Sequence, residues 1–199
     1  MTASDVLQPG LADTVHDGQQ IFRAAMNAFA NPGSIHDIPR APTPPAPLSP
    51  AASALILTLA DHETEIWLDH GLASSPSVLN FIRFHTGATI VDDPKRAAFA
   101  VVSEASNMPA LEDLSLGTLE YPDRSTTVIL QVSDLSADHG WQLSGPGIDG
   151  SVQLSITGAP SDLEMTLARN RALFPRGIDM LLVSRTCLAA LPRTTLVRK

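Results

Sequence analysis

Short apolar runs alternate along this chain with segments of helical periodicity, and this alternation constrains the fold more than any other feature. The runs are rich in β-branched and aliphatic residues, as buried strands are. They occupy residues 64–69, 97–102, 126–132, 152–156 and 179–184. Several are apolar at successive positions, so both faces of their sheet must be covered. The pattern predicts an α/β protein, a three-layer sandwich in which helices cover a mixed sheet.

A first helix is predicted over residues 19–30, where apolar side chains recur at three- and four-residue spacing. The apolar positions are Ile21, Phe22, Ala25, Met26 and Phe29. Asn-Pro-Gly at residues 31–33 ends this helix. Residues 39–50 then contain six prolines in twelve, a composition that excludes a helix or a central strand. We expect a single domain over residues 1–199, with residues 39–50 as a surface strap.

Capping signals mark the later helices. Ser49 and Ser75 are each followed by a proline, which pairs an N-cap residue with a favoured first helical position. Gly87 ends the helix that Ser75 begins. Ser161 and Glu164 have the spacing of a capping box and predict a further helix through residue 172.

One glycine-rich segment, Gly-Pro-Gly-Ile-Asp-Gly at residues 145–150, formally matches the dinucleotide-binding fingerprint. That fingerprint requires a helix N-terminus directly after the glycines. Here the segments on both sides are strand-like, so a hairpin turn is predicted. Gly147 is expected to need positive φ, and its replacement by Ala should disturb folding.

The charge is divided unevenly. The net charge of −8 argues against a general nucleic-acid binder. Residues 165–199, however, contain seven basic side chains and one acidic side chain, which gives this segment a net charge of +6. The rest of the chain therefore has a net charge of −14. These arginines either pair with acids elsewhere in the fold or form an anion-binding or docking face, because Arg grips phosphate and carboxylate through a planar fork.

The sequence lacks the residues that metal binding and Schiff-base chemistry require. The cluster Asp61-His62-Glu63 cannot close a tetrahedral site because sequential neighbours point in different directions, so no metal is expected. The chain has two lysines, and neither Lys95 in a polar turn nor the terminal Lys199 offers the desolvated pocket that Schiff-base chemistry needs. No cofactor is expected.

The expected compartment is the cytoplasm. The N-terminal sequence has neither the basic nor the apolar region of a signal peptide. No apolar run approaches the roughly 20 residues that a membrane span needs. The single cysteine, Cys187, lies in an apolar segment and is consistent with a reducing environment.

Candidate binding residues stand at the ends of predicted elements. Arg83 and His85 lie in the last turn of a helix, and the alternative to a binding role is that they stabilise its negative end. Arg176 and Asp179 enter one apolar run, and Arg193 follows the next. We expect Arg176 and Arg193 to lie near each other, at the ends of neighbouring strands, on a surface that a second subunit covers.

Seven blocks of the sequence, in order, are similar to the PhnH family of bacterial phosphonate metabolism. Residues 174–183 (FPRGIDMLLV) and the later LPRTT are the most specific. The blocks occupy residues 22–33, 55–68, 82–88, 126–132, 143–148, 174–183 and 190–195. They span nearly the whole chain.

This resemblance implies a fold similar to the large domain of pyridoxal-phosphate-dependent transferases, without the cofactor lysine. It implies a homodimer that joins PhnG, PhnI and PhnJ in the carbon–phosphorus lyase core complex. That complex transfers a phosphonate to the ribose of ATP and releases adenine, and the resemblance gives this subunit no catalytic residue. The chain is then inactive alone. The alternative is an independent anion- or nucleotide-binding enzyme that uses Arg83, His85, Arg176 and Arg193.

Overall fold

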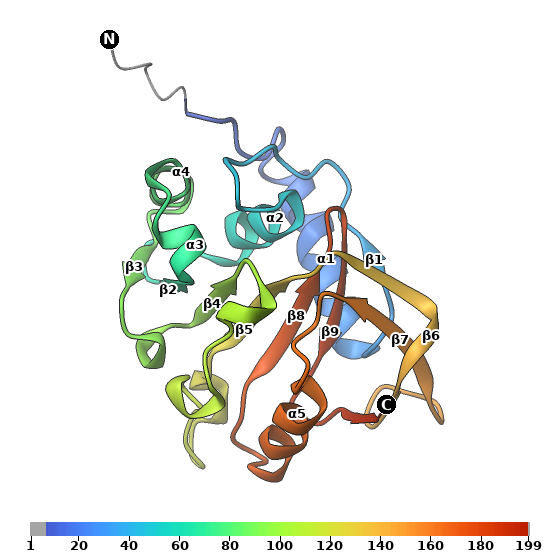
Figure 1. Ribbon diagram of the computed structural model, residues 1–199. Helices are drawn as coiled ribbons and strands as arrows, with labels where there is room; N and C mark the ends of the chain where they lie inside the picture. Colours follow the sequence, from blue (N-terminus) through green and yellow to red (C-terminus); the bar gives the residue numbers. More distant parts are fainter. Residues whose placement is uncertain (1–6, 199) are drawn as a thin grey trace.

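The computed structural model describes residues 7–198, which form a mixed α/β fold around a seven-stranded sheet (Figure 1). The strand order is β1-β9-β8-β5-β4-β2-β3. Strands β3, β2, β4, β5 and β8 run parallel, and β9 is antiparallel to both β8 and β1. The sheet is therefore mixed, as predicted. Its strands are β1 (His36–Asp37), β2 (Glu65–Leu68), β3 (Thr89–Val91), β4 (Phe99–Val102), β5 (Thr127–Gln131), β8 (Asp179–Val183) and β9 (Cys187–Leu191).

Five α-helices and a second, three-stranded sheet complete the described fold. The helices are α1 (His16–Ala30), α2 (Pro50–Leu59), α3 (His70–Ala73), α4 (Pro76–Thr86) and α5 (Leu163–Ala172). The second sheet has the order β10-β6-β7, with β6 (Asp134–Ser144), β7 (Val152–Thr157) and β10 (Leu196–Arg198). The sequence did not predict this second sheet as a separate unit.

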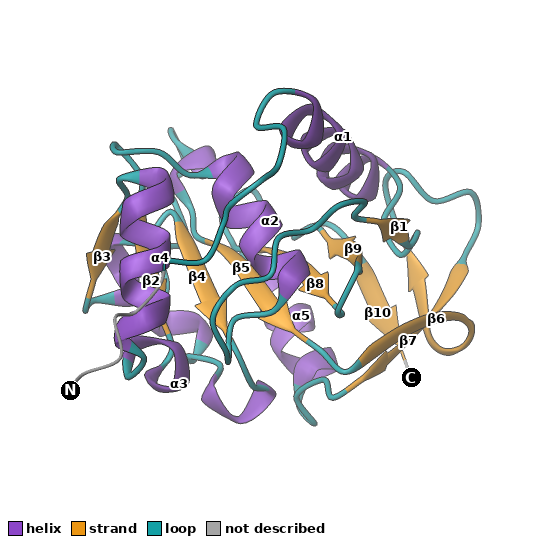
Figure 2. Cartoon of the chain, turned by 90° about the horizontal axis from the view of Figure 1, so that it is seen from above, coloured by secondary structure: helices purple, strands orange, loops and turns teal. Residues whose placement is uncertain are grey.

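Each face of the large sheet has its own apolar core. Ile129 of β5 packs in a cluster with α1, α2 and α4, whereas Val128 and Leu130 pack with α5 and the second sheet. Figure 2 shows α1, α2 and α4 along one side of the large sheet. Because successive strand residues point to opposite faces, strands buried on both faces must be apolar throughout.

Most of the predicted helix caps are confirmed. The Ser49 hydroxyl accepts a hydrogen bond from Ala52 N at 3.2 Å, and the Ser75 hydroxyl accepts one from Val78 N at 3.4 Å. Gly87 adopts φ 71° at the end of α4. The capping box is wrong, because α5 begins at Leu163 and its N-cap makes no side-chain hydrogen bond.

Helix α1 ends where predicted but buries a narrower stripe than its spacing suggested. Ile21 and Ala25 are buried, whereas Phe22 is 49% exposed and Met26 is 50% exposed. These two residues sit one position further round the helix, so they face away from the sheet. The first turn is held by Asp13, whose carboxylate accepts backbone N–H groups, chiefly that of His16, and these bonds lower its pKa.

The glycine-rich segment at residues 145–150 joins β6 to β7, an antiparallel pair, so the hairpin prediction is confirmed. Residues 39–49 contain no helix or strand and lead from β1 to α2. Within residues 7–198, no helix is both long and apolar enough to cross a bilayer.

Candidate functional site

Arg193 and Asp179 form an internal ion pair where β9 ends beside the start of β8. Arg193 Nη2 lies 2.5 Å from Asp179 Oδ2, and both Arg193 Nε and its backbone N–H donate to Asp179 Oδ1. The Arg193 side chain is only 13% exposed. Because β9 is antiparallel to β8, the chain that leaves β9 lies beside the start of β8, and Arg193, two residues after β9, reaches Asp179.

The remaining donors of the Arg193 guanidinium link the loop of Pro122 to the loop of Pro175. Its Nη1 donates to Pro122 O at 2.8 Å and to Pro175 O at 3.2 Å, and its Nη2 also donates to Ser125 Oγ at 2.7 Å. Arginine has five N–H donors in a fixed fork, so protein acceptors occupy this group almost completely. Arg193 therefore organises the chain and has little capacity left for a ligand.

Arg176 lies next to this junction, since Arg193 bonds to the carbonyl of the residue before it. Its Nε is buried and has no hydrogen-bond partner among the described residues. The two loops that Arg193 joins also carry exposed large apolar side chains. They are Leu119 (68% exposed), Tyr121 (52%) and Phe174 (63%), and we call these three residues with Arg176 the loop patch.

The other two predicted residues lie elsewhere. Arg83 and His85 are in the last turn of α4, which packs near β3, and β3 is separated from β9 by four strands. The His85 ring is engaged at 3.0 Å with the carbonyl of Gln8. The structure thus brings Arg176, Asp179 and Arg193 together and leaves Arg83 and His85 apart from them.

A polar cavity of about 610 Å³ lies at the opposite edge, where the parallel strands β4, β5 and β8 end. In open α/β sheets this carboxyl edge is the usual place for ligands. We call it the serine cavity. Its lining consists of Ser49, Ser103, Glu104, Ala105, Ser106, Gln131, Val132, Ser133, Gly158, Ser184 and Arg185.

A buried carboxylate holds one wall of the serine cavity in place. Asp69 follows β2, is fully buried, and caps α3 through Leu72 N at 3.0 Å. Its second oxygen accepts the backbone N–H of Ser103 at 2.7 Å, the Ser103 hydroxyl at 2.6 Å and the Asn107 amide at 3.2 Å. These bonds satisfy the buried charge and fix the loop after β4.

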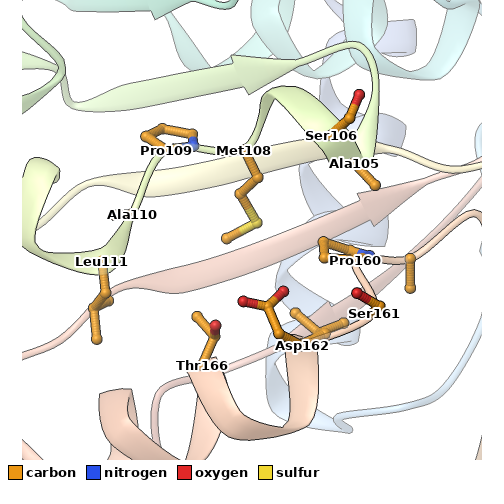
Figure 3. Close-up of a pocket in the computed structure, with 12 residues that line it drawn as sticks. Ala105, Ser106, Met108, Pro109, Ala110, Leu111, Pro160, Ser161, Asp162 and Thr166 are labelled. Carbon is orange, nitrogen blue, oxygen red and sulfur yellow. The ribbon is translucent and has the colours of Figure 1, made fainter.

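A second cavity, of about 690 Å³, adjoins the first, since Ala105 and Ser106 line both. It lies between the loop that follows β4 and the start of α5. Figure 3 shows Met108 projecting into it from one side and the Asp162 carboxylate from the other. Together the two cavities make a depression over the carboxyl edge of the sheet.

Other chemistries find no support among the described residues. No three His, Cys, Asp or Glu side chains within residues 7–198 are grouped so that they could hold a metal ion. Lys95 lies in a one-turn 3₁₀ helix before β4, at the amino edge and thus away from the serine cavity. Lys199 lies outside the described residues.

Comparison with known proteins places this arrangement in a family. The family model described as bacterial phosphonate metabolism protein (PhnH) matches residues 9–198. The chain belongs to the PhnH family. A relative from Rhizobium meliloti (strain 1021), alpha-D-ribose 1-methylphosphonate 5-triphosphate synthase subunit PhnH, is 41% identical over 196 residues, which cover 98% of each chain. The putative C-P lyase subunit protein HtxG of Stutzerimonas stutzeri is 31% identical over 180 residues, 89% of this chain and 84% of its own.

The two most specific PhnH-like blocks of the sequence meet in space at the ion pair. Asp179 belongs to the block FPRGIDMLLV and Arg193 to the block LPRTT, and their bonds join β8 to the end of β9. Both residues were predicted from the sequence as binding residues, but the bond between them was not predicted.

Proposed function

We propose that this chain is a subunit of an α-D-ribose 1-methylphosphonate 5-triphosphate synthase, acting in the carbon–phosphorus lyase core complex of phosphonate catabolism. The observation that carries the proposal is the 41% identity over 98% of both chains to a protein of that name. The HtxG relative, a putative C–P lyase subunit, supports the same assignment. The proposed compartment is the cytoplasm.

The proposed partners are the PhnG, PhnI and PhnJ subunits of that complex, together with a second copy of this chain. We assign the loop patch to one of the heteromeric contacts. Exposed aromatic side chains and an arginine are the groups that subunit interfaces favour. Arg176 is half-buried, and the exposed part of its side chain can pair with a partner carboxylate.

Co-purification with PhnG, PhnI and PhnJ tests this assignment. Arg176→Ala should reduce recovery of the complex while the variant itself keeps its melting temperature. Arg169→Ala is the matched control, because Arg169 is an exposed arginine on α5 and forms no hydrogen bond or ion pair with the described residues of the loop patch. Recovery of the intact complex with Arg176→Ala would refute the loop patch as an interface.

Growth on methylphosphonate as the sole phosphorus source tests the function itself. The wild-type chain should restore growth to a strain that lacks its own PhnH. Failure to restore growth, in cells where the protein is present and the complex assembles, would overturn the proposed function. Sedimentation of the purified chain tests the homodimer separately.

We also propose that the large sheet is related to the large domain of pyridoxal-phosphate-dependent transferases. Five parallel strands with one antiparallel neighbour and helices on both faces support this relation. The expected absence of the cofactor has a structural reason at Lys95, which lies at the wrong edge of the sheet for a site at the carboxyl ends of the strands.

A further inference from the structure

We propose that the serine cavity binds the tetrahedral oxyanion of a phosphonate or phosphate, with Arg185 and a set of free serine hydroxyls as its donors. The oxyanion site follows from the cavity alone. The preference for a phosphonate over a phosphate rests on the proposed function.

Three serine residues that line the cavity have hydroxyl protons that no acceptor in the described part of the chain takes up. Ser106 and Ser133 are exposed, and among the described residues neither hydroxyl forms a hydrogen bond within the chain. The Ser49 hydroxyl accepts from Ala52 N, which leaves its own proton to donate. Three serine O–H groups are therefore free to donate into one cavity. An oxyanion with three oxygens is an acceptor for such a set.

Arg185 supplies the positive charge. It lies in the turn between β8 and β9, lines the cavity, and is exposed. No ion pair of Arg185 is found within residues 7–198. Its planar guanidinium can donate two parallel hydrogen bonds to adjacent oxygens of a phosphonate or phosphate. In contrast to Arg193, its donors are not occupied by the protein.

The acidic side chains near the cavity determine whether a further substitution should strengthen or weaken anion binding. Asp69 lies behind the wall and is fully engaged by its four donors. Glu104 is the one acid among the described lining residues, and it is exposed. A like charge at the rim should oppose an anion, so removal of the Glu104 charge should strengthen binding.

The serine cavity is also large enough to hold a small organic anion. The volume falls within the range of small-molecule sites, so an organic substituent fits beside the oxyanion. Gly158, at φ 89°, brings its backbone close to Ser133, where an added Cβ would lie 3.1 Å from Ser133 Oγ. A side chain at this position would fill the cavity next to one of its free hydroxyls.

Calorimetric titration of the purified full chain with methylphosphonate, and separately with inorganic phosphate, tests the proposal. Arg185→Gln should weaken binding about tenfold or more, since it removes charge-assisted hydrogen bonds. Ser133→Ala should weaken it less, and Glu104→Gln should strengthen it. The control is Arg23→Gln, an exposed arginine on α1, which should stay within about twofold of wild type.

Two results would overturn the site: no heat of binding with either anion, or equal binding by wild type and Arg185→Gln. Binding of phosphate but not methylphosphonate would overturn the phosphonate preference alone. Melting temperatures of the variants show that each is folded. The outcome is independent of the co-purification experiment, because a chain can bind the anion and fail to assemble, or assemble and bind no anion.

Discussion

Replacing Gly147 with Ala should destabilise the protein far more than the same change at Gly150, although both glycines lie in one turn between β6 and β7. Both have positive φ, 83° at Gly147 and 71° at Gly150. An L-residue in this region costs about 1–2 kcal/mol of folding free energy. This backbone cost is common to the two substitutions.

The surroundings of the two glycines differ. A Cβ on Gly147 would lie 2.3 Å from the backbone oxygen of Ala30 and 2.9 Å from Pro32 Cδ, whereas a Cβ on Gly150 meets nothing within 4 Å. The Ala30 oxygen belongs to the end of α1 and cannot rotate away. Forcing an extra methyl group into a packed contact adds about 1–3 kcal/mol. We therefore expect a loss of about 2–5 kcal/mol for Gly147→Ala and about 1–2 kcal/mol for Gly150→Ala.

Urea denaturation, followed by circular dichroism, measures both free energies of unfolding on the same scale. The difference between the two variants isolates the contact between this turn and the end of α1, because the φ cost cancels. Equal destabilisation by the two substitutions would show that the turn does not pack against α1 in solution.

Two further predictions concern the buried Asn170 and the half-buried Cys187. Asn170 is buried, and its amide accepts from Ile178 N and donates to Ile178 O, each at 2.8 Å. Asn170→Asp should cost about 1–3 kcal/mol at neutral pH, because it removes the donor and buries a charge. Since burial raises the pKa of a carboxyl group, that loss should shrink as pH falls through the raised folded value, and a pH-independent loss in urea titrations would contradict this. Burial, and then the hydrogen bond from Cys187 Sγ to Asp37 Oδ1 at 3.2 Å, raises the pKa of the Cys187 thiol. The folded protein then keeps a thiol proton that the unfolded chain releases, so this group lowers stability as pH rises above the unfolded pKa. Asp37→Ala should speed alkylation of Cys187 by iodoacetamide at pH 8, whereas an unchanged rate would show that the carboxylate does not act on the thiol.

The elements that the sequence predicted well are those with local causes. Ser49 and Ser75 cap their helices because a hydroxyl reaches an N–H three residues on, whatever the rest of the fold does. The stripe on α1 was assigned less well. Phe22 and Ile21 are neighbours in sequence, and only the position of the sheet decides which of them is buried.

The serine cavity was missed because its residues are distant in sequence. Ser103, Ser133 and Ser184 meet only because each follows a strand and those strands are parallel neighbours. A signal was available, namely a serine at the end of, or directly after, each of three predicted apolar runs. The residues predicted instead, Arg176 and Asp179, enter the last run and therefore lie at the amino edge of the sheet.

The two edges of the large sheet therefore have different proposed roles, subunit assembly at the amino edge and anion binding at the carboxyl edge. Strand β8 begins at Asp179, bound by Arg193, and ends next to Ser184 and Arg185 in the serine cavity. At about 3.3 Å per residue, its length separates the two regions by roughly 15 Å. A partner on the loop patch and an anion in the serine cavity would thus contact different residues. Arg176→Ala and Arg185→Gln should accordingly fail different assays, the first in assembly and the second in anion binding.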